Sequence, residues 1–275
     1  MTLYVSDLDG TLLDSSAQIS SKSTELLNKA IKNNANFTIA TARTPATIVP
    51  ILKNINMKLP VIAMNGCSIY DIKTNKYLHT TCIIPELIPE LKRLITNADL
   101  NAFAYTMKND KLFVYHNKLT NPYQINFYNE RKSSNLKTFI ESDLPDNSKV
   151  LYFTIIDTEN KINKLYNKIK DMPQLSVIKY ADIYNKNVFN LEIYNHLSSK
   201  SNAINYIKKH FNFDRLITFG DNLNDIPMFK ISDECYAVEN AVQQLKDIST
   251  KTIGLNIDNS VAKYILNDSN KKTST

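Results

Sequence analysis

Two carboxylates lie close together near the beginning of the chain, in residues 7–11, which read DLDGT. The apolar run before them is typical of a buried strand, and residues two apart at the end of a strand point to the same face. We therefore expect Asp7 and Asp9 to lie side by side, with Leu8 directed into the sheet. Like charges at that distance repel each other, so the pair indicates a bound divalent cation. Gly10 would let the backbone turn sharply or approach a ligand, although Asp-Gly is also common in plain turns.

Polar residues also stand at other points where an apolar run ends or a helix begins. These further candidates are Thr41, Lys200, Asp221, Asn224 and Asp225. Ligands of open α/β sheets bind beyond the carboxyl ends of the strands. Residues this distant in sequence can meet the first acidic pair only if one sheet brings their strand ends together.

This set of residues suits phosphoryl transfer from a phosphate monoester. The reaction needs an in-line nucleophile, neutralisation of the phosphate oxygens and a proton for the leaving group. A carboxylate can be the nucleophile and form an aspartyl phosphate, with Mg²⁺ beside it because one anion must approach another. Lys200 and the Thr41 hydroxyl would donate to the phosphate. The residues alone make Asp7, Asp9, Lys200 and Asp221 the candidates for the chemistry.

The order of strands and helices predicts how these residues are positioned. In the first part of the chain, strands at 3–5, 37–40 and 61–64 alternate with helices at about 20–34 and from Thr44 onward. This order predicts an α/β fold with a right-handed, doubly wound parallel sheet. The pattern resumes near residue 196, with strands at 216–219 and 235–238, helices from about 241 and at 260–266, and a frayed polar tail at 267–275.

The middle of the chain follows a different pattern. After a hairpin, helices are expected at about 85–98 and 159–170, and strands on either side of 108–110 and at 150–156, 176–180 and 188–194. A polar stretch rich in Tyr and Asn follows near 120–135, and no element is assigned to it. This order suggests a compact open sheet covered by two helices. The domain prediction is a core of residues 1–82 and 195–275, into which residues 83–194 are inserted as an α+β domain.

Composition limits the function classes. A hydrophobic content of 43% and a charged content of 22% are typical of a globular protein. The net charge of +6 is spread over scattered lysines, so no nucleic-acid partner is expected. Three cysteines without a short spacing argue against a disulfide framework and fit a cytoplasmic protein. No segment resembles a signal peptide or a membrane span.

Taken together, the motifs resemble those of a known superfamily. The first acidic motif, a threonine ending the second strand, an isolated lysine opening a late helix, and GDNLND are similar to the four motifs of the haloacid dehalogenase (HAD) phosphohydrolases. The insertion after the second motif resembles the type IIB cap of Cof-like hydrolases. Asn65-Gly66 and Asn240-Ala241 also resemble positions that recur in that group. The resemblance implies a Rossmann-like HAD core sheet with an inserted α+β cap.

The resemblance also implies a role for each motif residue. Asp7 would be the nucleophile and a metal ligand, Asp9 the general acid and base with its carbonyl on the metal, and Asp221 the third ligand. Phosphate contacts would come from the backbone N–H groups of Leu8 and Ala42, the Thr41 hydroxyl, Lys200 and Asn224. Gly10, Arg43 at the rim and Asp225 would support them. Asp225 would orient Lys200 or a metal-bound water. Ala42 stands where the group often has glycine, and residues 239 and 259–260 also depart from its pattern.

Three functions stay open at this point. The first is a Mg²⁺-dependent phosphatase of small phosphorylated metabolites, the second a phosphohexomutase with the same core and cap, and the third an inactive protein that binds a partner or nucleic acid. Tyr105, Tyr115 and Tyr184 are expected to be core or surface residues more than substrate contacts. The sequence predicts neither the substrate nor the oligomeric state.

Overall fold

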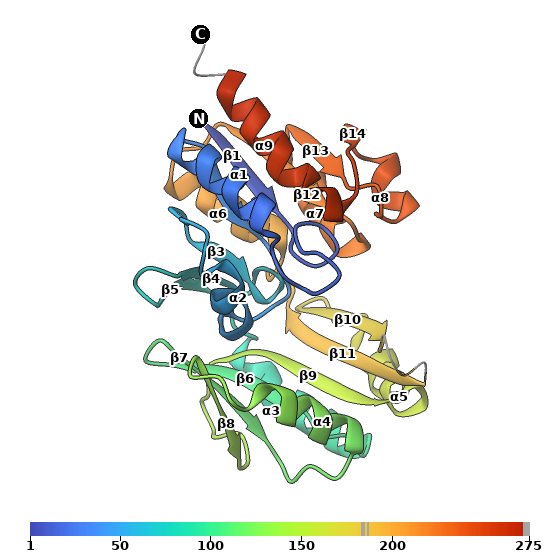
Figure 1. Ribbon diagram of the computed structural model, residues 1–275. Helices are drawn as coiled ribbons and strands as arrows, with labels where there is room; N and C mark the ends of the chain where they lie inside the picture. Colours follow the sequence, from blue (N-terminus) through green and yellow to red (C-terminus); the bar gives the residue numbers. More distant parts are fainter. Residues whose placement is uncertain (183–184, 186, 272–275) are drawn as a thin grey trace. The chain divides into compact units, whose positions relative to one another are not determined.

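The computed structural model describes residues 1–182, 185 and 187–271 and divides into two compact units (Figure 1). We call residues Met1–His79 with Ser199–Thr275 the core unit, and Thr80–Ser198 the cap unit. Tyr184 lies outside the described residues. The five-stranded parallel sheet belongs to the core unit and the six-stranded sheet to the cap unit, so each unit is described by itself.

The core unit is built on a parallel sheet whose central strand is β1 (Thr2–Ser6). The order β14-β13-β12-β1-β2 places β12 and β2 on either side of it, with Val5 opposite both Thr218 and Thr38. All five residues of β1 are buried, as expected of a strand covered on both faces. The other strands are β2 (Asn36–Ile39), β12 (Arg215–Gly220), β13 (Glu234–Ala237) and β14 (Lys251–Thr252). The predicted α/β fold with a parallel sheet is confirmed.

The third predicted strand differs from the expectation. β3 (Val61–Ala63) meets β2 only through the parallel bridge between Ala40 and Ile62. Its main partner is antiparallel, in a separate sheet of order β3-β4-β5 with β4 (Ser68–Asp71) and β5 (Lys76–Thr80). Met64, predicted to end the strand, instead begins the 3-10 turn η1 (Met64–Gly66), because its φ of 52° leaves the extended region.

The helices of the core unit are α1 (Ser21–Lys32), α2 (Pro45–Leu52), α6 (Lys200–His210), α7 (Ile226–Phe229), α8 (Gln243–Asp247) and α9 (Ser260–Lys271), with the 3-10 turns η3 (Leu223–Asp225) and η4 (Asn256–Asp258). α1 and α9 lie side by side (Figure 1). The prediction of a frayed tail at 267–275 was wrong for residues 267–271, which continue α9; residues 272–275 lie outside the described residues. Asp268 of α9 accepts hydrogen bonds from the Tyr4 hydroxyl (2.7 Å) and Arg215 (3.3 Å), so this polar stretch is tied to the sheet.

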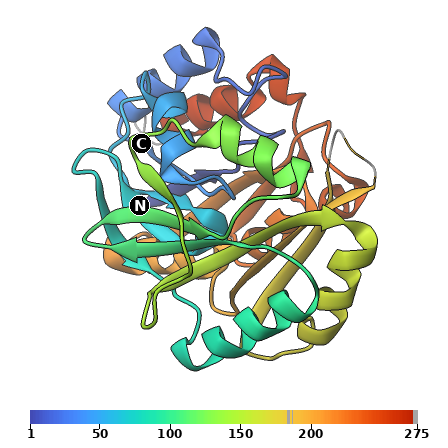
Figure 2. The ribbon, with the colours of Figure 1, turned by 90° about the horizontal axis from the view of Figure 1, so that it is seen from below.

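The cap unit has a six-stranded sheet of order β10-β11-β9-β6-β7-β8. Its strands are β6 (Phe103–Lys108), β7 (Lys111–His116), β8 (Lys137–Glu141), β9 (Val150–Thr158), β10 (Leu175–Ala181) and β11 (Val188–Asn195), and its helices are η2 (Pro85–Leu87), α3 (Ile88–Asn97), α4 (Pro122–Arg131) and α5 (Glu159–Ile169). α3 and α5 share one apolar core with the sheet, in which Leu91, Leu165 and Phe153 are buried. α4 lies over the other face, where the rings of Phe103 and Phe127 are 4.9 Å apart (Figure 2).

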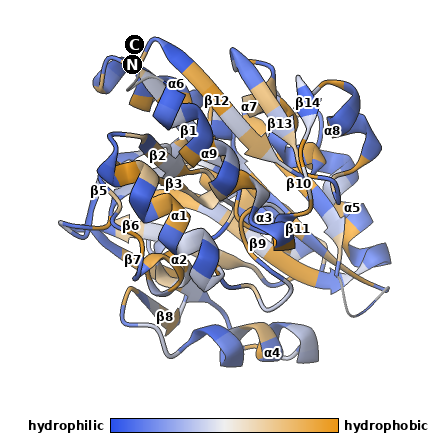
Figure 3. Ribbon diagram, turned by 45° about the horizontal axis from the view of Figure 1, so that its top comes forward, coloured by the Kyte–Doolittle hydropathy of each residue, from blue (hydrophilic) through white to orange (hydrophobic). Residues whose placement is uncertain are grey.

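α4 occupies the polar stretch near 120–135, to which no element was assigned from the sequence, and β8 follows it. Asn121 caps α4 by accepting from the backbone N–H of Tyr123, and Pro122 occupies the first turn. Only Gln124 is buried in this helix, and Figure 3 shows α4 largely in hydrophilic colours. Because no apolar face repeats along it, its sequence carries no helical periodicity. The cap sheet is therefore covered by three α-helices, not two.

The remaining predictions concern the cap tyrosines, the cysteines and membrane-spanning helices. Tyr105 is buried in the cap unit and Tyr115 packs against its apolar core. Cys67 and Cys235 are buried, and Cys82 is partly buried. Across the described part of the chain, no helix is both long enough and apolar enough to span a bilayer.

Candidate active site

Asp7 follows directly after β1 and continues its parallel pairing, since its backbone N–H donates to the carbonyl of Phe219 (2.9 Å). The side chain is 5% exposed. The ammonium of Lys200 donates to its Oδ1 at 2.5 Å. The nucleophile candidate is thus held at the strand end by a lysine that is distant in sequence.

Lys200 opens α6, whose first turn is capped by the Ser199 hydroxyl, which accepts from the N–H of Asn202 (3.1 Å). Its side chain is 2% exposed, and its Nζ donates to Asp225 Oδ1 (2.7 Å) as well as to Asp7. Burial disfavours the ammonium, but the carboxylates of Asp225 and Asp7 outweigh burial and raise its pKa. Lys200 therefore stays charged.

Asp225 is fully buried and both of its carboxylate oxygens are in use. Oδ1 accepts from Lys200, and Oδ2 accepts from the backbone N–H groups of Asp221 (3.0 Å) and Asn222 (3.2 Å). The same residue therefore orients the lysine and fixes the turn that follows β12. Gly220 has to be glycine here, because a Cβ would lie 2.6 Å from Asp225 Oδ2.

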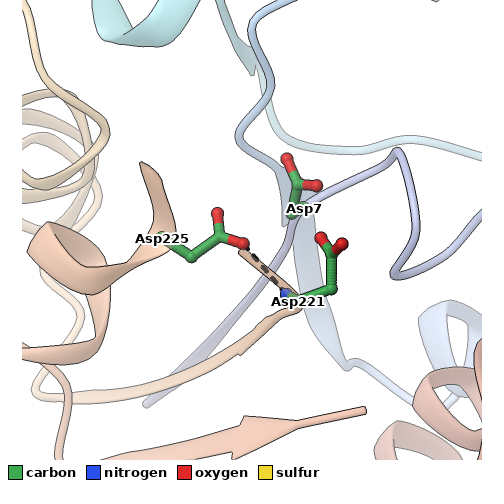
Figure 4. A group of neighbouring side chains, drawn as sticks. All are labelled: Asp7, Asp221 and Asp225. Carbon is green, nitrogen blue, oxygen red and sulfur yellow. Dashed lines mark hydrogen bonds between the residues drawn. The ribbon is translucent and has the colours of Figure 1, made fainter. Parts of the chain in front are cut away.

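Asp7, Asp221 and Asp225 form an acidic cluster, in which one carboxylate oxygen of each residue lies within 4.8 Å of the others (Figure 4). Burial raises the pKa of Asp7 to about 8, with added repulsion from Asp225 and Asp221 and an opposing effect of Lys200. Burial, with the charge of Asp225, raises the pKa of Asp221 to about 6. Three carboxylates share one ammonium, so the cluster lacks positive charge.

This donor set fits a hard divalent cation such as Mg²⁺, which prefers carboxylate oxygens. Asp225 is already saturated by the lysine and two N–H groups, so Asp7 and Asp221 are the residues that would hold the ion. Figure 4 shows the carboxylates of Asp7 and Asp221 next to each other, on the side away from the bond between Asp225 and the Asp221 backbone. The family resemblance implied both acids as metal ligands, together with the carbonyl of Asp9.

The loop after Asp7 fits closely against Asp221. Gly10 has a φ of +73°, and a Cβ at that position would lie 2.3 Å from Asp221 Oδ2. The Thr11 hydroxyl donates to Asp221 Oδ1 (3.1 Å). Glycine is thus required for both the turn and the close approach.

Asp9 lies apart from the acidic cluster found in the described residues. It is 54% exposed, and its carboxylate accepts two bonds from Arg43, at 2.8 Å from Nε and 2.6 Å from a terminal nitrogen. β1 has ended at Ser6, so the two-residue spacing no longer places both acids in one cluster. Arg43, expected at the rim or in a salt bridge, forms this bidentate pair.

The expected phosphate contacts surround the same strand ends. Thr41 follows β2, is 1% exposed, and its hydroxyl accepts from the N–H of Arg43 (3.2 Å). Leu8 is fully buried, as the sequence indicated. Ala42 and Asn224 are exposed.

Two asparagines that carry no predicted role hold the loop after Asp7. Asn240 donates to the carbonyl of Gly10 and Asn256 to that of Leu13, both at 2.7 Å. The Asn240 side chain also accepts from the N–H of Asn256 (3.2 Å). The family resemblance pointed to Asn240, but nothing in the sequence around Asn256 indicates this contact.

A family model described as haloacid dehalogenase-like hydrolase matches residues 4–265. The chain belongs to this family. Phosphatase YwpJ of Bacillus subtilis is 23% identical over 288 residues, which cover 95% of this chain and 98% of that protein. Among solved structures, a haloacid dehalogenase-like hydrolase from Bacteroides thetaiotaomicron has a TM-score of 0.79 at 20% identity, covering 97% of this chain and 99% of its own.

A second solved structure, described as a HAD subclass IIB sugar phosphatase, has a TM-score of 0.73 at 18% identity and covers 98% of this chain and 99% of its own. The predicted membership of the HAD superfamily is confirmed, and the fold is shared with a protein described as subclass IIB. The predicted hydrolase class is confirmed by the family, and the relative from Bacillus subtilis is described as a phosphatase.

Proposed function

We propose that this HAD phosphatase hydrolyses small phosphorylated metabolites with Mg²⁺, through an aspartyl phosphate on Asp7. The observation that carries the proposal is the convergence of Asp7, Lys200, Asp221 and Asp225 from distant parts of the sequence. A buried cluster with this excess of carboxylates disfavours folding unless a ligand compensates it, which indicates a site kept for function.

Asp7 Oδ1 is held by Lys200, so its other oxygen is the one to attack the phosphorus. Lys200 would bridge the nucleophile and the phosphate, with Asp225 keeping the ammonium in place. The Thr41 hydroxyl, the N–H groups of Leu8 and Ala42, and Asn224 would complete the phosphate contacts. A bound Mg²⁺ would neutralise the phosphate and screen it from the carboxylates.

Asp9 would act as the general acid for the leaving group and then as the base for water. Its carboxylate is exposed and bonded to Arg43, which lies two residues after Thr41. Arg43 occupies both carboxylate oxygens of Asp9, so neither oxygen is free to reach a leaving group in this state. The proposal therefore requires the Arg43 contact to loosen before Asp9 can donate a proton.

The division of labour between the two units also belongs to the proposal. The core unit would perform the chemistry, and the cap unit would determine which phosphate ester is accepted, corresponding to the predicted domains 1–82 with 195–275 and 83–194. A sugar phosphate is one candidate, because a neighbour of the same fold is described as a sugar phosphatase. Nucleotides and cofactor phosphates are others.

The direct test is phosphate release from p-nitrophenyl phosphate with and without Mg²⁺. Asp7→Asn should abolish release, because an amide cannot form the acyl phosphate, and chelation of Mg²⁺ should do the same to the unchanged protein. Retained activity of Asp7→Asn would remove Asp7 as nucleophile. Conversion of sugar phosphates without phosphate release would favour the phosphohexomutase, and no turnover of any phosphate ester would favour a binding protein.

A further inference from the structure

The cap unit contains a second buried lysine. Lys137 begins β8, where it lies opposite Leu112 of β7, and it is only 5% exposed. Lysine is almost never this buried unless its charge is paired. Its surroundings should therefore show a carboxylate, as those of Lys200 do.

Within residues 1–182, 185 and 187–271, no carboxylate or carbonyl accepts a hydrogen bond from the Lys137 ammonium. The ammonium instead lies over the face of the Phe139 ring, 5.4 Å from the ring centre. Burial lowers the pKa of Lys137 to about 8, and the charge of Arg131 lowers it further in the same direction. A buried cation thus faces another cation and an aromatic ring.

Arg131 ends α4 and supplies the second positive charge. Its guanidinium bonds to the exposed Glu130 (2.7 Å) and lies over the Phe127 ring, 4.1 Å from the ring centre. Glu130 is next to it in sequence and lies at the solvent side, so it balances Arg131 and leaves Lys137 without a counter-charge. The Arg131 side chain is 37% exposed, so an anion can reach it from solvent, while Lys137 is the buried member of the pair.

We propose that Lys137 and Arg131 form an anion-binding site in the cap unit, which takes a phosphate or carboxylate group of a small molecule. Such a group would supply the missing counter-charge and accept hydrogen bonds from both side chains. A metal cation is excluded by the two positive charges.

A nucleic acid fits the site poorly. The rings beside the two cations pack against one another edge to face, with Tyr128 and Phe139 5.2 Å apart and Phe103 and Phe139 6.0 Å apart. Their faces are therefore occupied by neighbouring rings or cations and do not form a platform for bases. The site suits one small anion.

The anion has two possible sources. It is either a second anionic group on the phosphorylated substrate, in which case this inference rests on the proposed function, or a separate small anion that regulates the enzyme. Two arms of one experiment separate them, and Lys132 provides the control. Lys132 is an exposed lysine at the end of the same helix, with its Nζ 5.2 Å from the centre of the Tyr128 ring.

The first arm measures binding without turnover. In Mg²⁺-free protein, the side-chain ¹³Cε and ¹⁵Nζ resonances of Lys137, assigned by their loss in Lys137→Met, are followed while citrate or inorganic phosphate is added. An anion at this site should raise the apparent pKa of Lys137 by about one unit or more, while that of Lys132 stays unchanged. If neither anion, nor fructose 1,6-bisphosphate in the same titration, moves the Lys137 resonances more than those of Lys132, the proposal is wrong.

The second arm compares fructose 1,6-bisphosphate with p-nitrophenyl phosphate as substrates. If the anion is part of the substrate, Lys137→Met should lower kcat/KM for fructose 1,6-bisphosphate about tenfold or more. The same variant should change kcat/KM for p-nitrophenyl phosphate by no more than about twofold. Lys132→Met should change neither value. If an anion shifts the Lys137 resonances but Lys137→Met affects both esters alike, the site binds a separate effector. If the unchanged protein hydrolyses neither ester, the proposed function fails, and the first arm still decides the anion site.

Discussion

Two lysines are buried to nearly the same extent, Lys200 in the core unit and Lys137 in the cap unit, but they differ in what surrounds them. Lys200 donates to two carboxylates, and its pKa is raised. Lys137 lies over an aromatic ring, and burial, with the charge of Arg131, lowers its pKa to about 8. Their opposite shifts arise from partners, since burial alone lowers the pKa of both.

The difference separates a site with excess negative charge from one with excess positive charge. In the core unit the lysine is paired inside the protein, and what is lacking is a cation for the excess carboxylates. In the cap unit the lysine itself lacks a partner, and what is lacking is an anion. Each unit therefore indicates the charge of its ligand by the charge that its own residues leave unbalanced.

Replacing each lysine by methionine tests this comparison most strongly. Lys200→Met leaves Asp7 and Asp225 buried without their cation, so we expect the free energy of unfolding to fall by about 3–5 kcal/mol and kcat to fall by about a thousandfold. Lys137→Met removes an unpaired buried charge, so stability should stay the same or rise by about 1 kcal/mol or more. Urea unfolding and phosphate release measure both. Equal destabilisation by the two variants would show that Lys137 has a counter-charge after all.

Gly10→Ala should have the next largest effect, and it is confined to the core unit. The new Cβ would collide with the Asp221 carboxylate, and the residue would have to keep a φ of +73°. We expect a loss of about 1–3 kcal/mol in stability and a weaker affinity for Mg²⁺, measured by the Mg²⁺ dependence of kcat. Gly254 offers a matched control, because a Cβ there meets only the flexible hydroxyl of Ser260 within 3 Å. Unchanged Mg²⁺ dependence in Gly10→Ala would contradict the close fit to Asp221.

The pH dependence of stability should have opposite signs in the two units. The pKa of Asp7 is raised to about 8 in the folded protein, above that of the unfolded chain. The folded state then binds more protons between about pH 4 and 8, so stability falls as pH rises through that window. The pKa of Lys137 is lowered to about 8, so stability rises between about pH 8 and 10.

Thermal unfolding of the Mg²⁺-free protein over this pH range measures both slopes. Asp7→Asn should flatten the fall below pH 8, and Lys137→Met should flatten the rise above it. The Asp7→Asn protein should therefore be inactive but more stable than the unchanged protein near pH 8. A steeper fall in that variant would mean that Asp7 is ionised and fully compensated by Lys200.

The core unit could be predicted from sequence much further than the cap unit, for a physical reason. Its strands are apolar runs buried on both faces, and its polar residues stand at strand ends and helix starts. Hydrophobic periodicity and capping or turn residues therefore locate these elements in the sequence. The four motifs therefore predicted the family and which residues converge. What the motifs did not predict is the bond between Asp9 and Arg43, because the direction of a side chain beyond a strand end depends on its tertiary partners.

In the cap unit, the features that matter have no periodic signal. α4 is fixed by the Asn121 cap and by ring contacts, and β8 begins with a lysine, which predicts a surface position. The anion site lies between these two elements, so it could not be found before both were known. Asn256 was missed for a related reason, since it acts on the Leu13 carbonyl across a long sequence separation.

The smallest expected effects compare the asparagines that hold each region together. Asn256→Ala removes the bond to the Leu13 carbonyl in the core unit, and Asn121→Ala removes the cap of α4 together with bonds to Ile156 and Asp157. Each should cost about 1 kcal/mol of stability. Their other effects should differ: Asn256→Ala should lower kcat a fewfold for every phosphate ester, because the loop that carries Asp9 and Gly10 loosens. Asn121→Ala should leave kcat for p-nitrophenyl phosphate unchanged. It should reduce the rise in the apparent pKa of Lys137 that an added anion causes, since α4 positions Arg131. If both variants lowered activity toward all esters alike, the division into a catalytic region and a recognition region would be wrong.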